Sequence, residues 1–232
     1  MQNEEHNRKD FRHYHSLTNN NIINKDQIEK RIFYHFFKKS FDELLSVVAI
    51  ILLIPVFIIT AILIKLDDPM GPIFYSQIRI GRNGHPFKMY KFRSMVINAD
   101  KRLEPLLKHN EVEGAMFKMK SDPRVTRIGK VIRKYSINEL PQLLNVIKGD
   151  MDLVGPRPPL RREVRNYTKY DKQRLLVIPG CTGLWQVSER NNVGFHEMVK
   201  LDIKYIINAS LWLDVCILFK TVWIMIFPND AY

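Results

Sequence analysis

The segment from Leu44 to Ile64 carries no charged residue over twenty-one consecutive positions, in a chain that is otherwise basic and polar. As one straight helix it would be about 31 Å long at ~1.5 Å per residue, close to the ~30 Å hydrocarbon core of a bilayer. A secretory signal peptide does not fit, because the run begins more than forty residues into the chain and lacks a small-residue cleavage site. The segment therefore predicts a membrane element.

Pro55 lies at the centre of this segment. A proline inside a helix removes a backbone hydrogen bond and clashes with the preceding turn, at roughly 3 kcal/mol, so a bend is expected at or just before Ile54. Lysine and arginine flank the segment on both sides, and they prefer the cytoplasmic side of short loops. A kinked spanning helix would place one basic flank on the unfavourable side. A re-entrant hairpin broken at Pro55 would keep both flanks on one side, and the residues alone leave both topologies open.

The formal net charge of +12 and the pI near 9.7 indicate anionic partners. Nucleic acid, anionic lipids of the inner leaflet and phosphorylated small molecules all satisfy that charge. A membrane-tethered nucleic-acid binder rests on charge alone, since no RNP-type aromatic motif and no helix-turn-helix signal is present, and no nucleic acid is expected as a partner. The two cysteines, Cys181 and Cys216, lack the spacing of a zinc site or a disulfide framework and fit a reducing compartment.

The sequence divides into three parts. Residues 1–30 are polar and rich in asparagine and predict a flexible arm, and residues 31–66 hold a membrane-associated helix and the hairpin. Apolar residues at helical spacing over 27–43 predict an amphipathic helix on the membrane, with a core helix as the alternative. Residues 67–232 contain many glycine and proline turns and predict an irregular α/β domain. Its apolar helix over 210–227 is expected at the interface or buried against the domain, and exposed apolar surface along it would permit a homodimer.

Basic residues gather beside the turns of this domain. Arginine binds phosphate oxygens through two donors and lysine adds a point charge, so a diphosphate site needs several such residues from different loops. The candidates are Arg79, Lys91, Arg93, Lys118, Lys120, Arg124, Arg127, Lys130, Arg133, Arg157 and Arg190. A solvated basic surface is the alternative, and neither GxGxxG nor GxxxxGK[ST] is present.

Glu139 lies near the start of a helix expected in SINELPQLLNV, with Ser136 as its N-cap. A carboxylate there could simply face the helix dipole. Alternatively, beside the GPRP turn at 155–158, it would hold a divalent cation against a diphosphate.

Four motifs stand in order along the chain: KFRSM at 91–95, DPRVTRIGKVIRKYSINELPQLLNVIKGDMDLVGPRPPL at 122–160, PGCTGLWQVSERN at 179–191, and LWLDVCILFKT at 211–221. They resemble the bacterial sugar transferases called monotopic phosphoglycosyl transferases, and the resemblance covers roughly residues 38–232. It implies an enzyme at the cytoplasmic face of the bacterial inner membrane that moves a sugar-1-phosphate from a UDP-sugar to a polyprenyl (undecaprenyl) phosphate. Magnesium is the implied cofactor, the re-entrant monotopic topology is the implied topology, and capsule, exopolysaccharide or O-antigen assembly is the implied pathway. Larger relatives carry an additional multi-span region, and this chain resembles the small form.

The resemblance also assigns roles to individual residues. Asn138 and Glu139 occupy the positions of the family's catalytic Asp-Glu dyad, and Glu139 is the implied magnesium ligand. Five residues are the implied substrate ligands, four of them for the diphosphate: Lys91, Arg93, Arg157, Arg190 and, as an acidic position near the site, Asp202. Before the hairpin, Lys38, Lys39 and Asp42 match a basic-plus-Asp pattern that would anchor the head-group region, with Asp42 satisfying the hairpin backbone or a nearby arginine.

Position 138 departs from the family. In the family's mechanism the aspartate attacks the β-phosphate and carries the phosphosugar as a covalent intermediate, but the neutral amide of Asn138 is a far poorer nucleophile. Either an aspartate has been replaced, naturally or to trap an inert protein, or Glu139 serves instead, or the chain binds UDP-sugars without turnover. Glu189, where the family usually has glycine, adds a second departure beside Arg190.

Overall fold

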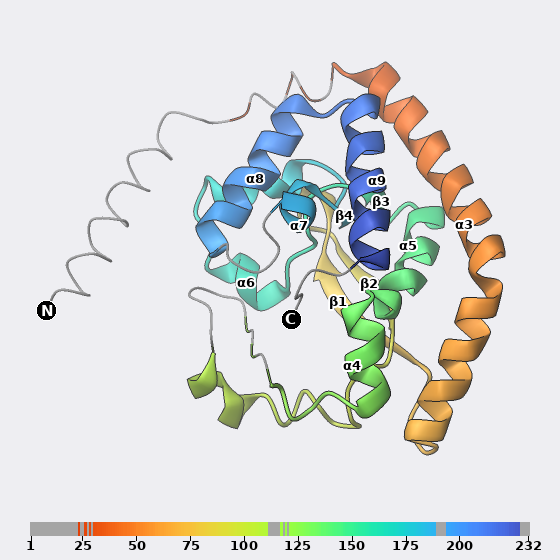
Figure 1. Ribbon diagram of the computed structural model, residues 1–232. Coiled ribbons are helices and arrows are strands. Elements are labelled where there is room, and N and C mark those ends of the chain that lie inside the picture. Colours follow the sequence, from red (N-terminus) through yellow and green to blue (C-terminus); the bar gives the residue numbers. More distant parts are fainter. Residues whose placement is uncertain are drawn as a thin grey trace, which may run out of the picture.

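The computed structural model describes residues 23, 26, 28, 30–110, 117, 119, 121–188 and 194–227 (Figure 1). Its α-helices are α3 (Ile32–Asp67), α4 (Arg127–Lys134), α5 (Leu143–Ile147), α6 (Arg161–Arg165), α7 (Leu184–Ser188), α8 (Phe195–Asn208) and α9 (Leu211–Ile226). Its strands are β1 (Phe74–Ile80), β2 (Pro86–Phe92), β3 (Asp152–Val154) and β4 (Gly180–Thr182). Its 3-10 helices are η1 (Arg82–Gly84), η2 (Glu104–His109), η3 (Ile137–Gln142) and η4 (Asp171–Leu176). The predicted arm lies almost wholly outside the described residues.

The strands form two small sheets. β1 and β2 make an antiparallel hairpin in which Phe74 lies opposite Phe92 and Ile80 opposite Pro86, while β3 and β4 pair in parallel. Short helices surround both sheets without regular alternation (Figure 1). The prediction of a mixed, irregular α/β domain is confirmed.

The larger hydrophobic core lies between α5, β3, α8 and α9. Val154 and Val199 are fully buried in it, and Ile217 contributes from α9. Buried residues recur along α8 at helical spacing, which gives this helix one face toward the core. Each large apolar side chain buried in this way stabilises the fold by about 1.5–3 kcal/mol.

Helix α3 is continuous over 36 residues and includes Pro55. At ~1.5 Å per residue it is about 54 Å long, and Figure 1 shows it curving along one side of the domain. The predicted amphipathic helix and the apolar segment are therefore parts of one helix, which begins at Ile32. The chain stays helical through Pro55, so the expected break is replaced by a curved helix; one missing backbone hydrogen bond bends a helix without ending it.

The apolar side chains of α3 face outward. Only 11% of its most apolar stretch is buried within the protein, and α3 is the one helix among the described residues that is long and apolar enough to cross a membrane. Phe33 is 81% exposed and Leu52 is 73% exposed. This exposure rules out the alternative of a core helix and makes α3 a membrane-compatible surface.

The inner face of α3 is polar where it meets the domain. The Lys38 ammonium lies 2.9 Å from Asp214 of α9 and 3.1 Å from Asp42. Asp42 also accepts a 2.9 Å hydrogen bond from the backbone N–H of Leu153 in β3. Lys38 and Asp42 are buried, so the predicted head-group contact is wrong for both: their charges are satisfied inside the protein. Lys39 is exposed and lies 3.8 Å from Glu43.

Tyrosines complete this polar cluster. Tyr205 of α8 donates a 2.7 Å hydrogen bond to Asp214, and Tyr34 of α3 donates one of 2.9 Å. The predicted 210–227 helix matches α9, and the Ser210 hydroxyl caps it by accepting from the N–H of Leu213. One face of α9 is buried, whereas Trp212 and Trp223 are exposed.

Candidate active site

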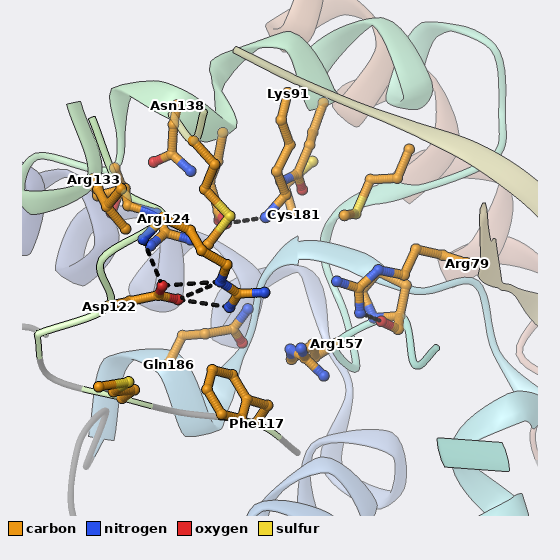
Figure 2. Close-up of a pocket in the computed structure, with 18 of the residues that line it drawn as sticks. Arg79, Lys91, Phe117, Asp122, Arg124, Arg133, Asn138, Arg157, Cys181 and Gln186 are labelled. Carbon is orange, nitrogen blue, oxygen red and sulfur yellow. Dashed lines mark hydrogen bonds and ion pairs between the residues drawn. The ribbon is translucent and has the colours of Figure 1, made fainter. Parts of the chain in front are cut away.

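A cavity of about 670 Å³ opens between β2, η3, α7 and the loop after β3 (Figure 2). Its volume lies in the range of small-molecule sites. Of the residues that the structure describes, six cationic side chains line it: Arg79, Lys91, Arg124, Lys130, Arg133 and Arg157. Among the described residues, the carboxylates lining it are Asp122 and Glu139. The cavity is therefore strongly positive and suits a polyanion such as a diphosphate.

Asn138 and Glu139 reach the cavity from η3. Ser136 is the N-cap residue of η3, as predicted, but its backbone is left-handed (φ 55°) and its side chain makes no capping hydrogen bond. Asn138 is only 7% exposed. The Lys91 ammonium of β2 donates a 2.5 Å hydrogen bond to Glu139. Packing of η3 against β2 brings the two together.

The cations of the cavity crowd one another. Burial lowers the pKa of Lys91, with Arg79 and Arg157 adding to the effect and Glu139 opposing it. Burial and the adjacent Arg157 lower the pKa of Arg79 to about 10. Burial also lowers the pKa of Arg133. An incoming anion would relieve this mutual repulsion, which favours its binding.

Hydrogen bonds hold the arginines in place. Arg79 of β1 donates to the Pro158 carbonyl at 3.0 Å and to Gln77 at 2.8 Å. Behind the cavity, Arg174 donates to the Arg157 carbonyl at 3.1 Å and pairs with Asp202 at 2.6 Å. The latter pair is fully buried, and burial raises the pKa of Asp202 to about 6 against the opposing effect of Arg174. Asp202 thus supports the Arg157 loop from behind.

Asp122 forms an ion pair with Arg124. Arg124 donates to both carboxylate oxygens of Asp122, at distances from 2.6 to 3.1 Å (Figure 2). Burial favours the protonated acid, but the hydrogen bonds and charge of Arg124 outweigh it, so the pKa of Asp122 is lowered. This carboxylate is an ionised partner of Arg124.

Two glycines bring the loop after β3 into contact with the start of β4. Gly155 N–H donates to the Thr182 carbonyl at 2.9 Å, and Gly180 N–H donates to the Pro156 carbonyl at 2.9 Å. A Cβ atom on Gly180 would lie 2.0 Å from the Gly155 nitrogen. The loop after β3 carries Arg157 and β4 carries Cys181, and both residues line the cavity, so the close approach of the glycines holds two parts of its wall together.

The structure brings together Lys91, Asn138, Glu139 and Arg157 of the predicted site residues. Arg93 does not line the cavity: it pairs with Asp68 and donates to the Pro72 carbonyl at 2.6 Å, which ties β2 to the end of α3. Arg190 lies outside the described residues, as do Glu189 and the phosphate candidates Lys118 and Lys120. Four of the other basic residues predicted as phosphate ligands also line the cavity: Arg79, Arg124, Lys130 and Arg133.

Trp185 and Gln186 of α7 and Gln142 of η3 also line the cavity, and sequence reasoning gave them no role. They are uncharged and lie inside apolar stretches, where neither charge nor spacing distinguishes them from core residues. Only their place in the fold reveals them.

The described part of the chain contains no metal site formed by protein side chains alone. Among the described residues, no three His, Cys, Asp or Glu side chains lie close enough to hold an ion. Magnesium, however, is commonly bound by one or two carboxylates with substrate phosphates and water completing its shell. Glu139, partly exposed at the wall of a cavity rich in phosphate-binding cations, fits that mode.

A long lipid-compatible helix packed on a domain with a cationic, nucleotide-sized cavity defines a membrane-associated protein suited to phosphorylated ligands. The sequence model of the family described as Bacterial sugar transferase matches residues 33–228, and the chain belongs to that family.

Similarity to individual proteins is high. Galactosyl transferase CpsE of Streptococcus agalactiae is 51% identical over 162 residues, covering 69% of this chain and 36% of that protein. Undecaprenyl-phosphate galactose phosphotransferase of Salmonella typhimurium is 43% identical over 201 residues, covering 85% of this chain and 42% of that protein. Exopolysaccharide production protein ExoY of Sinorhizobium fredii is 43% identical over 199 residues, covering 84% and 88%. The chain thus spans about two fifths of the length of the first two relatives.

Proposed function

We propose that this chain transfers a sugar-1-phosphate from a UDP-sugar to undecaprenyl phosphate at the cytoplasmic face of the inner membrane, in the assembly of capsule, exopolysaccharide or O-antigen. One observation carries the proposal: the cationic cavity has Asn138 and Glu139 of η3 on its wall, and η3 is joined to helices that pack on the membrane-compatible helix α3. Helices α4 and α5, which flank η3 in sequence, both pack on α3. A soluble nucleotide sugar and a lipid phosphate could therefore meet there.

The reaction exchanges one phosphorus–oxygen bond for another in each of two steps. A carboxylate attacks the β-phosphorus, its new bond forms as the bond to uridine monophosphate breaks, and the nucleotide leaves with the bond electrons. An oxygen of the lipid phosphate then attacks the same phosphorus and frees the carboxylate. Arg79, Lys91 and Arg157 would bind the phosphate oxygens and offset the charge that builds up on the leaving group.

Position 138 decides how much turnover this chain supports. Asn138 has no carboxylate, and the carboxylate adjacent to it, Glu139, is held by Lys91 at 2.5 Å. These two observations favour a second candidate function, in which the chain binds UDP-sugars without turnover. Asn138→Asp restores the group that the first step requires.

Magnesium is proposed as the cofactor, with Glu139 as the protein ligand. When bound, the ion would neutralise charge on the diphosphate. Glu139 would exchange its contact with Lys91 for the ion, and Lys91 would turn to the phosphate oxygens.

A re-entrant, monotopic arrangement of α3 is proposed for the topology, with anionic lipids of the inner leaflet next to the basic flanks. Leu45, Ala49 and Ile50 of the first half of α3 pack against the larger hydrophobic core. Phe57 and Ile64 of the second half pack in the smaller cluster that contains Phe92 and Ile132. Both halves therefore contact the same domain, which is hard to reconcile with a helix whose ends lie on opposite sides of a bilayer. The curvature of α3, a helix that contains Pro55, supports the same arrangement.

The test is release of uridine monophosphate from a panel of UDP-sugars, with and without undecaprenyl phosphate and Mg²⁺. The full chain is compared with Asn138→Asp and with the double variant Asn138→Asp/Glu139→Gln. We expect the release to need both lipid phosphate and Mg²⁺. We also expect its rate to rise at least 100-fold in Asn138→Asp. Tight UDP-sugar binding with no release from the unaltered chain supports the binding role. No release from either the chain or Asn138→Asp would rule out the transfer reaction.

A further inference from the structure

Two neighbouring side chains in the wall of the cavity carry buried polar atoms without a hydrogen-bond partner in the described structure. They are the indole Nε1 of Trp185 and the amide Oε1 of Gln186. Leaving a buried donor or acceptor unpaired costs about 1–3 kcal/mol. Because both residues line the same cavity, a polar ligand bound there is the candidate partner for the two atoms.

The two atoms specify the chemistry of that ligand. An indole Nε1 only donates, and an amide Oε1 only accepts, so a ligand that pairs with both must present one acceptor and one donor. The edge of uracil does so, since its N3–H lies between two carbonyl oxygens. The same cavity offers Met95, Phe117 and Val125 as apolar wall for a flat ring.

We propose that Trp185 and Gln186 form a uracil-binding subsite, in which Gln186 Oε1 accepts from uracil N3–H and Trp185 Nε1 donates to an adjacent carbonyl oxygen. This rests on the proposed function in taking a UDP-sugar as the substrate. Figure 2 shows Gln186 and Phe117 on the side of the cavity away from Asn138 and Lys91. A diphosphate bound by cations of the cavity wall, Arg124 and Arg157 among them, would connect the base to the reacting end.

A change in the ligand tests the subsite without altering the protein. Uridine monophosphate and 3-methyluridine monophosphate differ by a methyl group in place of the N3 hydrogen. For the full chain in detergent, isothermal titration should give a Kd at least tenfold higher for the methylated nucleotide, because Oε1 would then face a methyl group. Equal dissociation constants for the two nucleotides would overturn the proposal.

Protein variants then assign the effect to these two residues. Gln186→Met keeps the length of the side chain and removes its amide; Trp185→Phe keeps an aromatic ring and removes its N–H. Each should raise the Kd for uridine monophosphate about tenfold and leave pyrophosphate binding unchanged, which also reports an intact cavity. Gln186→Met should lose the discrimination against the methylated nucleotide. The matched control is Trp212→Phe, since Trp212 is 76% exposed on α9 and its indole lies outside the cavity.

Persisting tenfold discrimination in Gln186→Met would show that Gln186 does not read N3–H and would overturn the assignment. The outcome is separable from that of the transfer reaction, because binding needs no turnover. If the chain discriminates between the two nucleotides but releases no uridine monophosphate from UDP-sugars, the uracil subsite is supported and the transfer reaction is ruled out. If the chain turns over UDP-sugars but binds both nucleotides equally, the transfer reaction is supported and the uracil subsite is ruled out.

Discussion

Lys38 and Asp214 are 176 positions apart in the sequence, yet their side chains meet at 2.9 Å in the interior and join the membrane helix to the last helix of the domain. Asp42, Tyr34 and Tyr205 complete the hydrogen bonds of the pair. Because the pair is buried, each charge depends on the other for its stability.

Lys38→Met is therefore expected to lower the free energy of unfolding by about 3–5 kcal/mol, since it leaves buried carboxylates without their cation. Chemical unfolding in detergent, followed by circular dichroism, measures the change. Lys39→Met is the matched control: Lys39 is exposed, and its removal should alter stability by no more than about 0.5 kcal/mol. Similar stabilities for the two variants would contradict this account of the pair.

The same cluster predicts a dependence of stability on pH. Burial raises the pKa of Asp152 to about 7, with Asp42 and Asp214 adding to the effect and Lys38 opposing it. The folded state therefore favours the protonated form of Asp152. The stability that this group contributes is fully present below about pH 4, the ordinary pKa of an aspartate, and it is lost as the pH rises through about 7. Asp152→Asn removes this loss, and its stability relative to the unaltered chain should rise between pH 4 and pH 8 by at least about 1 kcal/mol. Unfolding at the two pH values measures it, and a pH-independent difference would refute it.

Arg157→Ala is expected to weaken pyrophosphate binding ten- to 100-fold, because a charge-assisted hydrogen bond to phosphate contributes about 1.5–3 kcal/mol. Titration calorimetry on the full chain measures the change. Arg127→Ala provides the control, since Arg127 is exposed on α4 and does not line the cavity. Equal weakening by the two substitutions would mean that general surface charge, rather than the cavity, binds the anion.

Cysteine labelling tests the topology. In a background with Cys181 and Cys216 replaced by serine, Lys30→Cys and Met70→Cys place single thiols beyond the two ends of α3. Both should react with a membrane-impermeant maleimide in inverted vesicles and neither in intact cells with a permeabilised outer membrane. Reaction of one thiol from each side would show that α3 spans the bilayer.

The sequence was sufficient where a local pattern determines the structure. The uncharged run from Leu44 to Ile64 identified the membrane-compatible helix, and the predicted 210–227 helix agrees with Leu211–Ile226 to within a residue at each end. Both are long and apolar, which sets them apart without any tertiary information.

Contacts between distant segments could not be predicted in the same way. Arg93 carries the same charge as Lys91 two residues earlier, but β2 ends at Phe92, so strand alternation no longer places the two side chains on one face. Asp68 at the end of α3 then captures Arg93. Lys38 likewise resembled a head-group anchor until the fold supplied a buried acid from α9. In both cases a partner remote in sequence determined the role.

The contact between Gly155 and Gly180 limits how this enzyme family can be re-engineered. With no room for a side chain between the two glycines, the loop that carries Arg157 and the strand that carries Cys181 form one tightly packed unit. Replacing only one of these two segments with that of a relative that prefers another sugar would disrupt the packing between Gly155 and Gly180. Chimaeras that aim to alter the donor should therefore exchange both segments together.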